Sequence, residues 1–409
     1  MLPSGVPNRP LTRVLAGAFA LACALACAGV LPAFAAPASP PTNPTADPAT
    51  GDSASPVSVD SEPVGGPLMG GRGVVVPNGV PAPPAGVNAT GWVLADAQTG
   101  AVLAARNPHG RYLPASTLKT LTALTLLPRL ADRDQVVTAT AQDSNIDGTR
   151  VGLVAGGRYT VDMLFHCMLM MSGNDCATAL AEAAGGVPHT LDLMNDEARR
   201  LHANDTHAAT PSGLDGPEQG TSAYDLALIL RQNLKLADFV RYNTTMQGTV
   251  PAQPPKYGSF KFGNDNALLW NYPGTIAAKN GYTDAARHTY VGAARHGQRT
   301  LIITLMHGER QPVDMWKQAA LLLDWGFALP ATAEPVGELV EPGDHNVAHA
   351  TTVQSPRPAA AAPPASSTPT SSNGLRIGLW PPLLGGVAVL AVFGSLLGWR
   401  RRSRDPDPT

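Results

Sequence analysis

Residues 113–120 read Leu-Pro-Ala-Ser-Thr-Leu-Lys-Thr and open an apolar segment that runs to about Leu127. Pro114 suits the position just before a helix, because the N–H that proline lacks has no partner there. In a helix, Ser116 and Lys119 are three residues apart and project from one face. A lysine in a desolvated cleft can have its pKa lowered enough to accept the serine proton. The stretch therefore predicts a nucleophilic serine with a lysine base, although Ser-x-x-Lys alone also occurs on solvated helix faces.

A second polar motif, Ser-Gly-Asn-Asp at residues 172–175, separates two hydrophobic segments that both have helical character. The first covers Met163–Met171, and the second runs to about Ala184. One interpretation is structural, because Ser172 or Asn174 would serve well as a helix N-cap. The functional interpretation places the Ser172 hydroxyl and the Asn174 amide in a cleft, where they relay protons and hold a substrate amide.

A third motif lies in Thr275–Thr283, which reads TIAAKNGYT. Strand-like runs follow at 289–294 and 301–306, so we expect an antiparallel meander with residues 275–283 on an edge strand. There, Lys279 and a side-chain donor at Asn280 can bind a carboxylate, and Gly281 lets the backbone approach closely. An alternative Lys-x-Gly at 256–258 lies in the Pro-rich run PAQPPKYGSF without a comparable strand pair after it. The pattern favours Lys279.

Both ends of the chain carry membrane signals. Arg9 and Arg13 precede an apolar run at 14–30 and an Ala-Phe-Ala triplet, so residues 1–36 are predicted as a signal peptide, with a first transmembrane helix as the alternative. Residues 379–399 are charge-free and long enough to cross one hydrocarbon core. An arginine cluster follows, which predicts a single-pass transmembrane helix with a cytoplasmic basic tail at 400–409.

The composition of the remaining chain predicts one folded unit between two linkers. Residues 37–87 are rich in Pro, Ala and Gly, and residues 331–378 are rich in Pro, Ala and Ser, so neither can bury enough apolar surface to offset its ordering entropy. The folded unit is therefore expected at 88–330, on the extracytoplasmic side of the cell membrane. After signal removal, Cys167 and Cys176 remain, either as a disulfide or as two buried thiols.

The overall charge and the metal-ligand patterns exclude some classes of function. A net charge of −2 gives no indication of a nucleic-acid partner. The sequence contains no His-Glu-x-x-His motif and no paired-cysteine ligand set, so no metal or cofactor is implied.

In chain order, Ser-x-x-Lys, Ser-x-Asn and Lys-x-Gly form the motif set of penicillin-binding proteins and class A β-lactamases. Residues 88–328 resemble the D-alanyl-D-alanine carboxypeptidase family of low-molecular-mass penicillin-binding proteins, peptidase family S11. Further stretches carry the resemblance: LADAQTG at 94–100, TPSGLD at 210–215, TSAYDL at 221–226, NALL at 266–269 and LDWGF at 323–327.

The resemblance implies an α/β fold of the α+β type with two lobes, an antiparallel sheet with flanking helices and an all-helical lobe. It implies that Ser116 attacks D-Ala-D-Ala and forms an acyl-enzyme, with Lys119 as the general base. Ser172 then serves proton transfer and Asn174 orientation. The implied substrate-binding residues are Lys279, Asn280, Gly281 and Tyr282. The backbone N–H groups of Ser116 and Tyr282 form the implied oxyanion hole. The implied partners are peptidoglycan stem peptides and β-lactams.

Three departures from the family pattern bear on function. Asn280 stands where the family usually has Thr, although its amide can still donate a hydrogen bond. Arg287 stands where Gly is expected, and no β-rich C-terminal domain is expected after Leu329.

Three alternative functions remain open. A D,D-endopeptidase or transpeptidase would use the same residues. A class A β-lactamase would need a Glu-x-x-Leu-Asn deacylation motif, which the sequence lacks. A catalytically silent wall-binding protein is the non-enzyme alternative.

Overall fold

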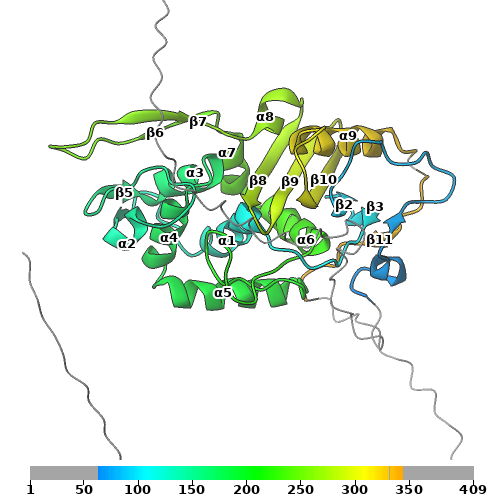
Figure 1. The fold of residues 1–409 in the computed structure, drawn as a ribbon, viewed down its shortest axis with the longest axis horizontal. Helices are drawn as coiled ribbons and strands as arrows, with labels where there is room; N and C mark the ends of the chain where they lie inside the picture. Colours follow the sequence, from blue (N-terminus) through cyan, green and yellow to red (C-terminus); the bar gives the residue numbers. More distant parts are fainter. Residues whose placement is uncertain (1–62, 331, 344–409) are drawn as a thin grey trace, which may run out of the picture. The chain divides into compact units, whose positions relative to one another are not determined.

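A seven-stranded antiparallel sheet forms the centre of the protein in a computed structural model, which describes residues 63–330 and 332–343 (Figure 1). The strands follow the order β1-β3-β2-β10-β9-β8, and β11 pairs with β3. Their bounds are β1 Val74–Val75, β2 Gly91–Asp96, β3 Ala101–Arg106, β8 Thr275–Thr283, β9 Arg287–His296, β10 Arg299–Gly308 and β11 Gly337–Glu338. The expected meander is therefore present as β8-β9-β10, and β8 is an edge strand.

Helices cover both faces of this sheet, which explains why its central strands are hydrophobic at almost every position. Successive side chains of a strand point to opposite faces. In β10, Leu301 and Ile303 join the core under α9 (Met315–Ala328). Their neighbour Ile302 joins the larger core that includes α6 (Ala223–Asn233). The sheet is therefore the middle layer between α9 and α6.

Most of the remaining helices build a second, mainly helical lobe beside the sheet (Figure 1). Its helices are α1 Lys119–Leu126, α2 Ala141–Ser144, α3 Val161–Met170, α4 Asn174–Ala183, α5 Val187–Arg200 and α7 Ala237–Thr244. Every residue of α1 is buried, because this helix packs against α3, α4, α5 and α6 at once. The shorter elements are the 3-10 turns Pro67–Gly70 and Ala115–Leu118, the strand pairs β4 Val136–Thr138 with β5 Arg158–Thr160 and β6 Gln247–Val250 with β7 Phe260–Gly263, and α8 Ala267–Asn271.

The folded region is longer at both ends than the sequence indicates. We predicted linker from residue 37 to 87 and tether from 331, but Met69 is fully buried and β1 pairs with β3. At the other end, β11 also pairs with β3, and Leu339 is buried. In the described parts of these two segments, 63–87 and 332–343, short strands pair with β3, and the composition of the segments does not reveal this pairing.

Several predicted segments lie outside the described residues, namely 1–36, the linker up to 62, the tether from 344 to 378, and residues 379–409. Within the described ranges, no helix is long and apolar enough to cross a bilayer. Cys167 and Cys176, whose state the sequence leaves open, are both free and buried. Burial raises the pKa of the Cys176 thiol well above its ordinary value.

Candidate active site

Ser116 and Lys119 lie within hydrogen-bond distance at the start of the buried helix α1. The Lys119 Nζ donates to Ser116 Oγ at 2.9 Å, to Asn174 Oδ1 at 2.7 Å and to the Ser212 carbonyl at 2.6 Å. The other two partners are carbonyl-type oxygens that only accept, whereas the Ser116 hydroxyl can also donate, so a neutral Lys119 can direct its lone pair at this hydroxyl. The contacts leave the lysine little freedom and aim its nitrogen at the serine hydroxyl.

Lys119 is held in an environment that favours its neutral form. Burial lowers its pKa well below the ordinary value, and the positive charge of Lys279 lowers it further, whereas more distant acidic groups such as Asp175 act in the opposite direction. No ion pair to Lys119 is found in the described part of the chain. Because a neutral amine can accept a proton, the site can supply the base that a serine nucleophile needs.

The second motif, residues 172–175, lies next to Ser116 and Lys119. The interpretation of Ser172 or Asn174 as a helix N-cap is wrong. The N-cap of α4 is Gly173, without a side-chain cap, so neither Ser172 nor Asn174 has that role. The Asn174 amide bridges the site: its oxygen accepts from Lys119, and its nitrogen donates to the Asp147 carbonyl at 2.7 Å. Ser172 has a φ of 61° and lines the cavity described below.

Asp175, the last residue of that motif, has a part that sequence reasoning missed. Its buried carboxylate accepts the backbone N–H groups of three consecutive residues, 151–153, at 3.1, 2.8 and 3.0 Å. A carboxylate that accepts several backbone donors fixes the loop that carries them. Asp175 thereby anchors the loop before β5 against the start of α4, next to Asn174.

The third motif lies on the edge strand β8 and packs directly on the serine. A Cβ at Gly281 would lie 2.7 Å from the Ser116 backbone nitrogen and 2.5 Å from Thr289 Oγ1, so this position excludes any side chain. Lys279 is buried, which lowers its pKa to about 8. Its Nζ donates to the carbonyl of Asn280 at 2.7 Å and to the Asn280 amide oxygen at 3.1 Å.

A cavity of about 430 Å³ lies over these groups. Five of the eight predicted site residues line it. Of the other three, Lys119 donates to Ser116 and Lys279 to Asn280, and the Asn174 backbone N–H donates to the carbonyl of the lining residue Thr149. The lining residues are Ser116, Thr149, Ser172, Asp265, Ala267, Asn280, Gly281, Tyr282, His288, Thr289, Tyr290, Arg310, Asp314, Met315 and Trp316. The alternative Lys256 is in the exposed β6–β7 loop and does not line it. Sequence spacing gave no signal for Asp265, Arg310 or Trp316.

Arg287 begins β9 in the left-handed region, with a φ of 53°. Glycine adopts this conformation at little cost, which accounts for the glycine expected there. The arginine is held instead by a bidentate ion pair with Glu309, at 2.7 and 2.9 Å. Arg287 thus lies at the start of β9, next to the lining residue His288, and it does not itself line the cavity.

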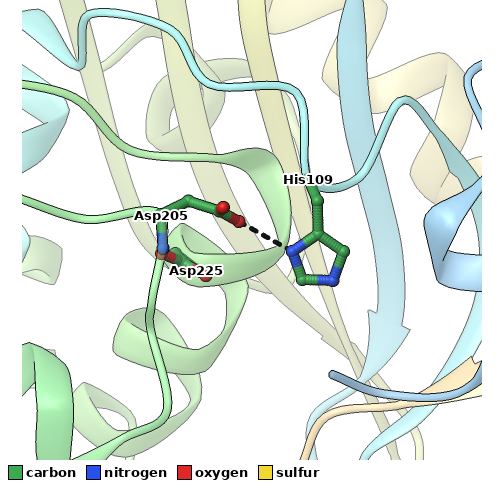
Figure 2. Close-up of side chains that lie close together, drawn as sticks. All are labelled: His109, Asp205 and Asp225. Atoms are coloured by element: carbon green, nitrogen blue, oxygen red, sulfur yellow. Dashed lines mark hydrogen bonds and ion pairs between the residues drawn. The ribbon is translucent and has the colours of Figure 1, made fainter. Parts of the chain in front are cut away.

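Figure 2 shows a second cluster, formed by His109, Asp205 and Asp225, the only group of three or more potential metal ligands found in the described ranges. His109 Nδ1 lies 2.7 Å from Asp205, and its Nε2 lies 3.0 Å from the Val64 carbonyl. Both neighbours are acceptors, so the contacts fit a protonated imidazole that donates twice. Burial alone would lower the pKa of His109, but Asp205 and Asp225 raise it. The cluster ties the Val64 segment to the start of α6.

A buried lysine bonded to a serine at a helix start, between an antiparallel sheet and a helical lobe, is the arrangement of serine D,D-peptidases and β-lactamases. Residues 78–310 match the family described as D-alanyl-D-alanine carboxypeptidase. DacB2 of Mycobacterium tuberculosis, a D-alanyl-D-alanine carboxypeptidase, is 42% identical over 253 residues, which are 61% of this chain and 85% of the relative. DacD of Salmonella typhimurium, also a D-alanyl-D-alanine carboxypeptidase, is 34% identical over 62% of this chain and 66% of its own length.

A solved structure agrees with these relatives. The crystal structure of a D-alanyl-D-alanine carboxypeptidase from Mycobacterium tuberculosis superposes with a TM-score of 0.61 at 40% identity and covers 64% of this chain and 99% of that one. The chain belongs to the D-alanyl-D-alanine carboxypeptidase family, which is a family of serine hydrolases. The predicted family, fold class and enzymatic activity are thereby confirmed.

Proposed function

We propose that this enzyme removes the terminal D-alanine from peptidoglycan stem peptides through an acyl-enzyme on Ser116, and that β-lactams acylate the same serine. The observation that carries the proposal is the 2.9 Å contact between Ser116 Oγ and the buried Lys119 Nζ. Lys119 takes the hydroxyl proton while Ser116 Oγ attacks the carbonyl of the penultimate D-alanine. The new C–O bond gives a tetrahedral intermediate, and when this intermediate collapses the C–N bond to the last D-alanine breaks and that amine leaves with a proton.

The other motif residues have supporting roles in this scheme. The backbone N–H groups of Ser116 and Tyr282 stabilise the negative oxygen of the tetrahedral intermediate, a contribution that typically reaches a hundredfold or more in rate. The position of Gly281 supports this role, because a Cβ there would lie only 2.7 Å from the Ser116 nitrogen and the β8 backbone therefore runs close to that N–H. Ser172 passes the proton towards the leaving amine, and Asn174 orients Lys119 and the substrate amide. Water then hydrolyses the ester and frees Ser116.

The substrate's terminal carboxylate is bound at the third motif in this proposal. Lys279 supplies positive charge from behind Asn280, whose amide oxygen accepts from it. The Asn280 NH₂ is then directed to other acceptors, and it donates to the carboxylate in place of the usual threonine hydroxyl.

Carboxylate recognition predicts a marked difference between two peptides. An acylated tripeptide that ends in D-Ala-D-Ala should lose one D-alanine, whereas the analogue with a C-terminal carboxamide should be cleaved about ten- to hundredfold less efficiently in kcat/KM, because it loses a charge-assisted hydrogen bond. Product analysis by mass spectrometry measures both. Equal cleavage of the two peptides would argue for an endopeptidase, and transfer of the acyl group to an added amine in preference to water would argue for a transpeptidase.

We also propose that the enzyme works on the extracytoplasmic side of the cell membrane, with residues 379–399 as its anchor. The motifs at both termini support this proposal: an apolar run with a small-residue triplet at the start, and an apolar run followed by arginines at the end.

Shortening the chain tests this location. A chain that keeps residues 1–36 but ends after residue 343 retains β11 and should be released in soluble form outside the cytoplasm while it still binds penicillin. Cell fractionation with fluorescent penicillin measures both properties, and the full-length chain is the control in the membrane fraction. A shortened chain that stays in the membrane would show that residues 1–36 are an uncleaved anchor.

A further inference from the structure

Asp265 brings a negative charge into the cavity that holds Ser116. Its side chain is exposed and lines the cavity, between β7 and α8. No hydrogen bond or ion pair to its carboxylate is found among the residues that the structure describes. Two cations of the site have other partners, since Lys279 donates to Asn280 and Arg310 pairs with Asp314 at 3.1 Å. Asp265 is thus a carboxylate in the cleft without a protein partner in the described part of the chain.

The loop that carries Asp265 is held firmly on both sides. Asn264 is buried and donates to the carbonyls of Asn243 and Thr245, both at 3.0 Å. Asn266 is also buried, and its amide oxygen accepts from the hydroxyl of Tyr290 at 2.8 Å. With its two neighbours fixed inward, the residue between them is presented outward in a defined place. Such an arrangement suits recognition, since little ordering entropy remains to be lost on binding.

The charge of Asp265 does not help the catalytic lysines. Burial lowers the pKa of Lys119 and of Lys279, and the Asp265 carboxylate acts against this lowering in both cases. A neutral residue would serve the proposed base better, because it would leave more of Lys119 unprotonated. We therefore look for the function of this carboxylate in substrate binding.

We propose that Asp265 binds a primary ammonium group on the side chain that precedes D-Ala-D-Ala in the peptide substrate. An exposed carboxylate in a cleft recognises a cation by charge and by a charge-assisted hydrogen bond. The inference rests on the proposed function, since it concerns the same substrate in the same cavity. It assigns the enzyme to peptides with a free side-chain amine, and it predicts discrimination against peptides in which that amine is acylated, as it is after cross-linking.

Two matched peptides test this assignment. Both are Nα-acetyl-L-lysyl-D-alanyl-D-alanine, one with a free ε-ammonium and one acetylated on that nitrogen. We expect the wild-type enzyme to prefer the free amine by about tenfold in kcat/KM, within the range of one charge-assisted hydrogen bond. In the Asp265→Asn variant, this ratio should fall to about one, chiefly through KM. Asp192→Asn, which removes the same charge from an exposed position on α5, should keep the wild-type ratio.

The outcomes separate this inference from the function on which it rests. If wild-type enzyme cleaves both peptides at equal rates, the function stands and the role of Asp265 is overturned. If Asp265→Asn keeps the wild-type ratio while both rates change together, the residue acts through Lys119 or Lys279, and the assignment is again overturned. If wild-type enzyme cleaves neither peptide, the proposed function fails and this inference fails with it.

Discussion

Replacing Ser116 by alanine should abolish covalent labelling by fluorescent penicillin and reduce D-alanine release by roughly a thousandfold or more, as loss of a covalent nucleophile does in other serine peptidases. The acyl-enzyme needs an oxygen at this position, and the cavity offers only one other serine hydroxyl, that of Ser172. Among the residues that the structure describes, the hydrogen bond found for Ser116 Oγ is the one from Lys119 Nζ. The variant therefore loses the nucleophile and little of the fold.

The structural integrity of this variant can be measured separately. Thermal unfolding of Ser116→Ala should stay within a few degrees of the wild type, because the one hydrogen bond that the variant loses is worth about 1 kcal/mol. Ser259→Ala, an exposed serine in the β6–β7 loop, should label at the wild-type rate. Acylation of Ser116→Ala at that same rate would show that the nucleophile is another residue.

The side chains of the candidate site could be singled out from the sequence because they are concentrated in three short motifs. Ser116 and Lys119 are three residues apart, so local helical geometry alone brings them together. The structure places Gly281 where a Cβ would lie only 2.7 Å from the Ser116 nitrogen, so a glycine at this position of the motif has a steric reason. Strand alternation and turn residues also placed the β8-β9-β10 meander to within a few residues.

Other parts of the site depend on contacts between segments far apart in sequence. Lys119 donates to the backbone carbonyl of Ser212, which lies 93 positions away in the sequence. Every residue has a backbone carbonyl, so the sequence does not indicate this partner. In the sequence, Asp175 looks like an ordinary helix-start residue. The structure shows that its carboxylate accepts hydrogen bonds from the backbone N–H groups of residues 151–153. The limits of the folded region were missed for a similar reason, since the described parts of the two low-complexity segments pair with β3 through β1 and β11, and local composition does not encode this pairing.

Replacing Lys119 by arginine should also abolish acylation, even though the positive charge is retained. Arginine stays protonated in proteins and so has no lone pair to accept the Ser116 proton. In the wild type, burial and the nearby Lys279 lower the pKa of Lys119, so its neutral, active form grows as pH rises. The acylation rate of the wild type should therefore increase with pH and level off above that pKa. We expect Lys119→Arg to be slower by roughly 10³-fold, a loss of about 4 kcal/mol in transition-state stabilisation, with no such rise.

A guanidinium is larger than an ammonium, and Lys119 is fully buried between Asn174 and Ser212, so the arginine variant can also fail to pack. Lys119→Met keeps an unbranched chain of similar length without a base, and it separates the two effects. Stopped-flow acylation by a chromogenic β-lactam, together with thermal unfolding, measures rate and folding in both variants. If both fold and both lose acylation, the base is Lys119. If a folded Lys119→Met variant acylates at the wild-type rate with an unaltered pH profile, another group takes the serine proton, and the 2.9 Å contact would only position Ser116.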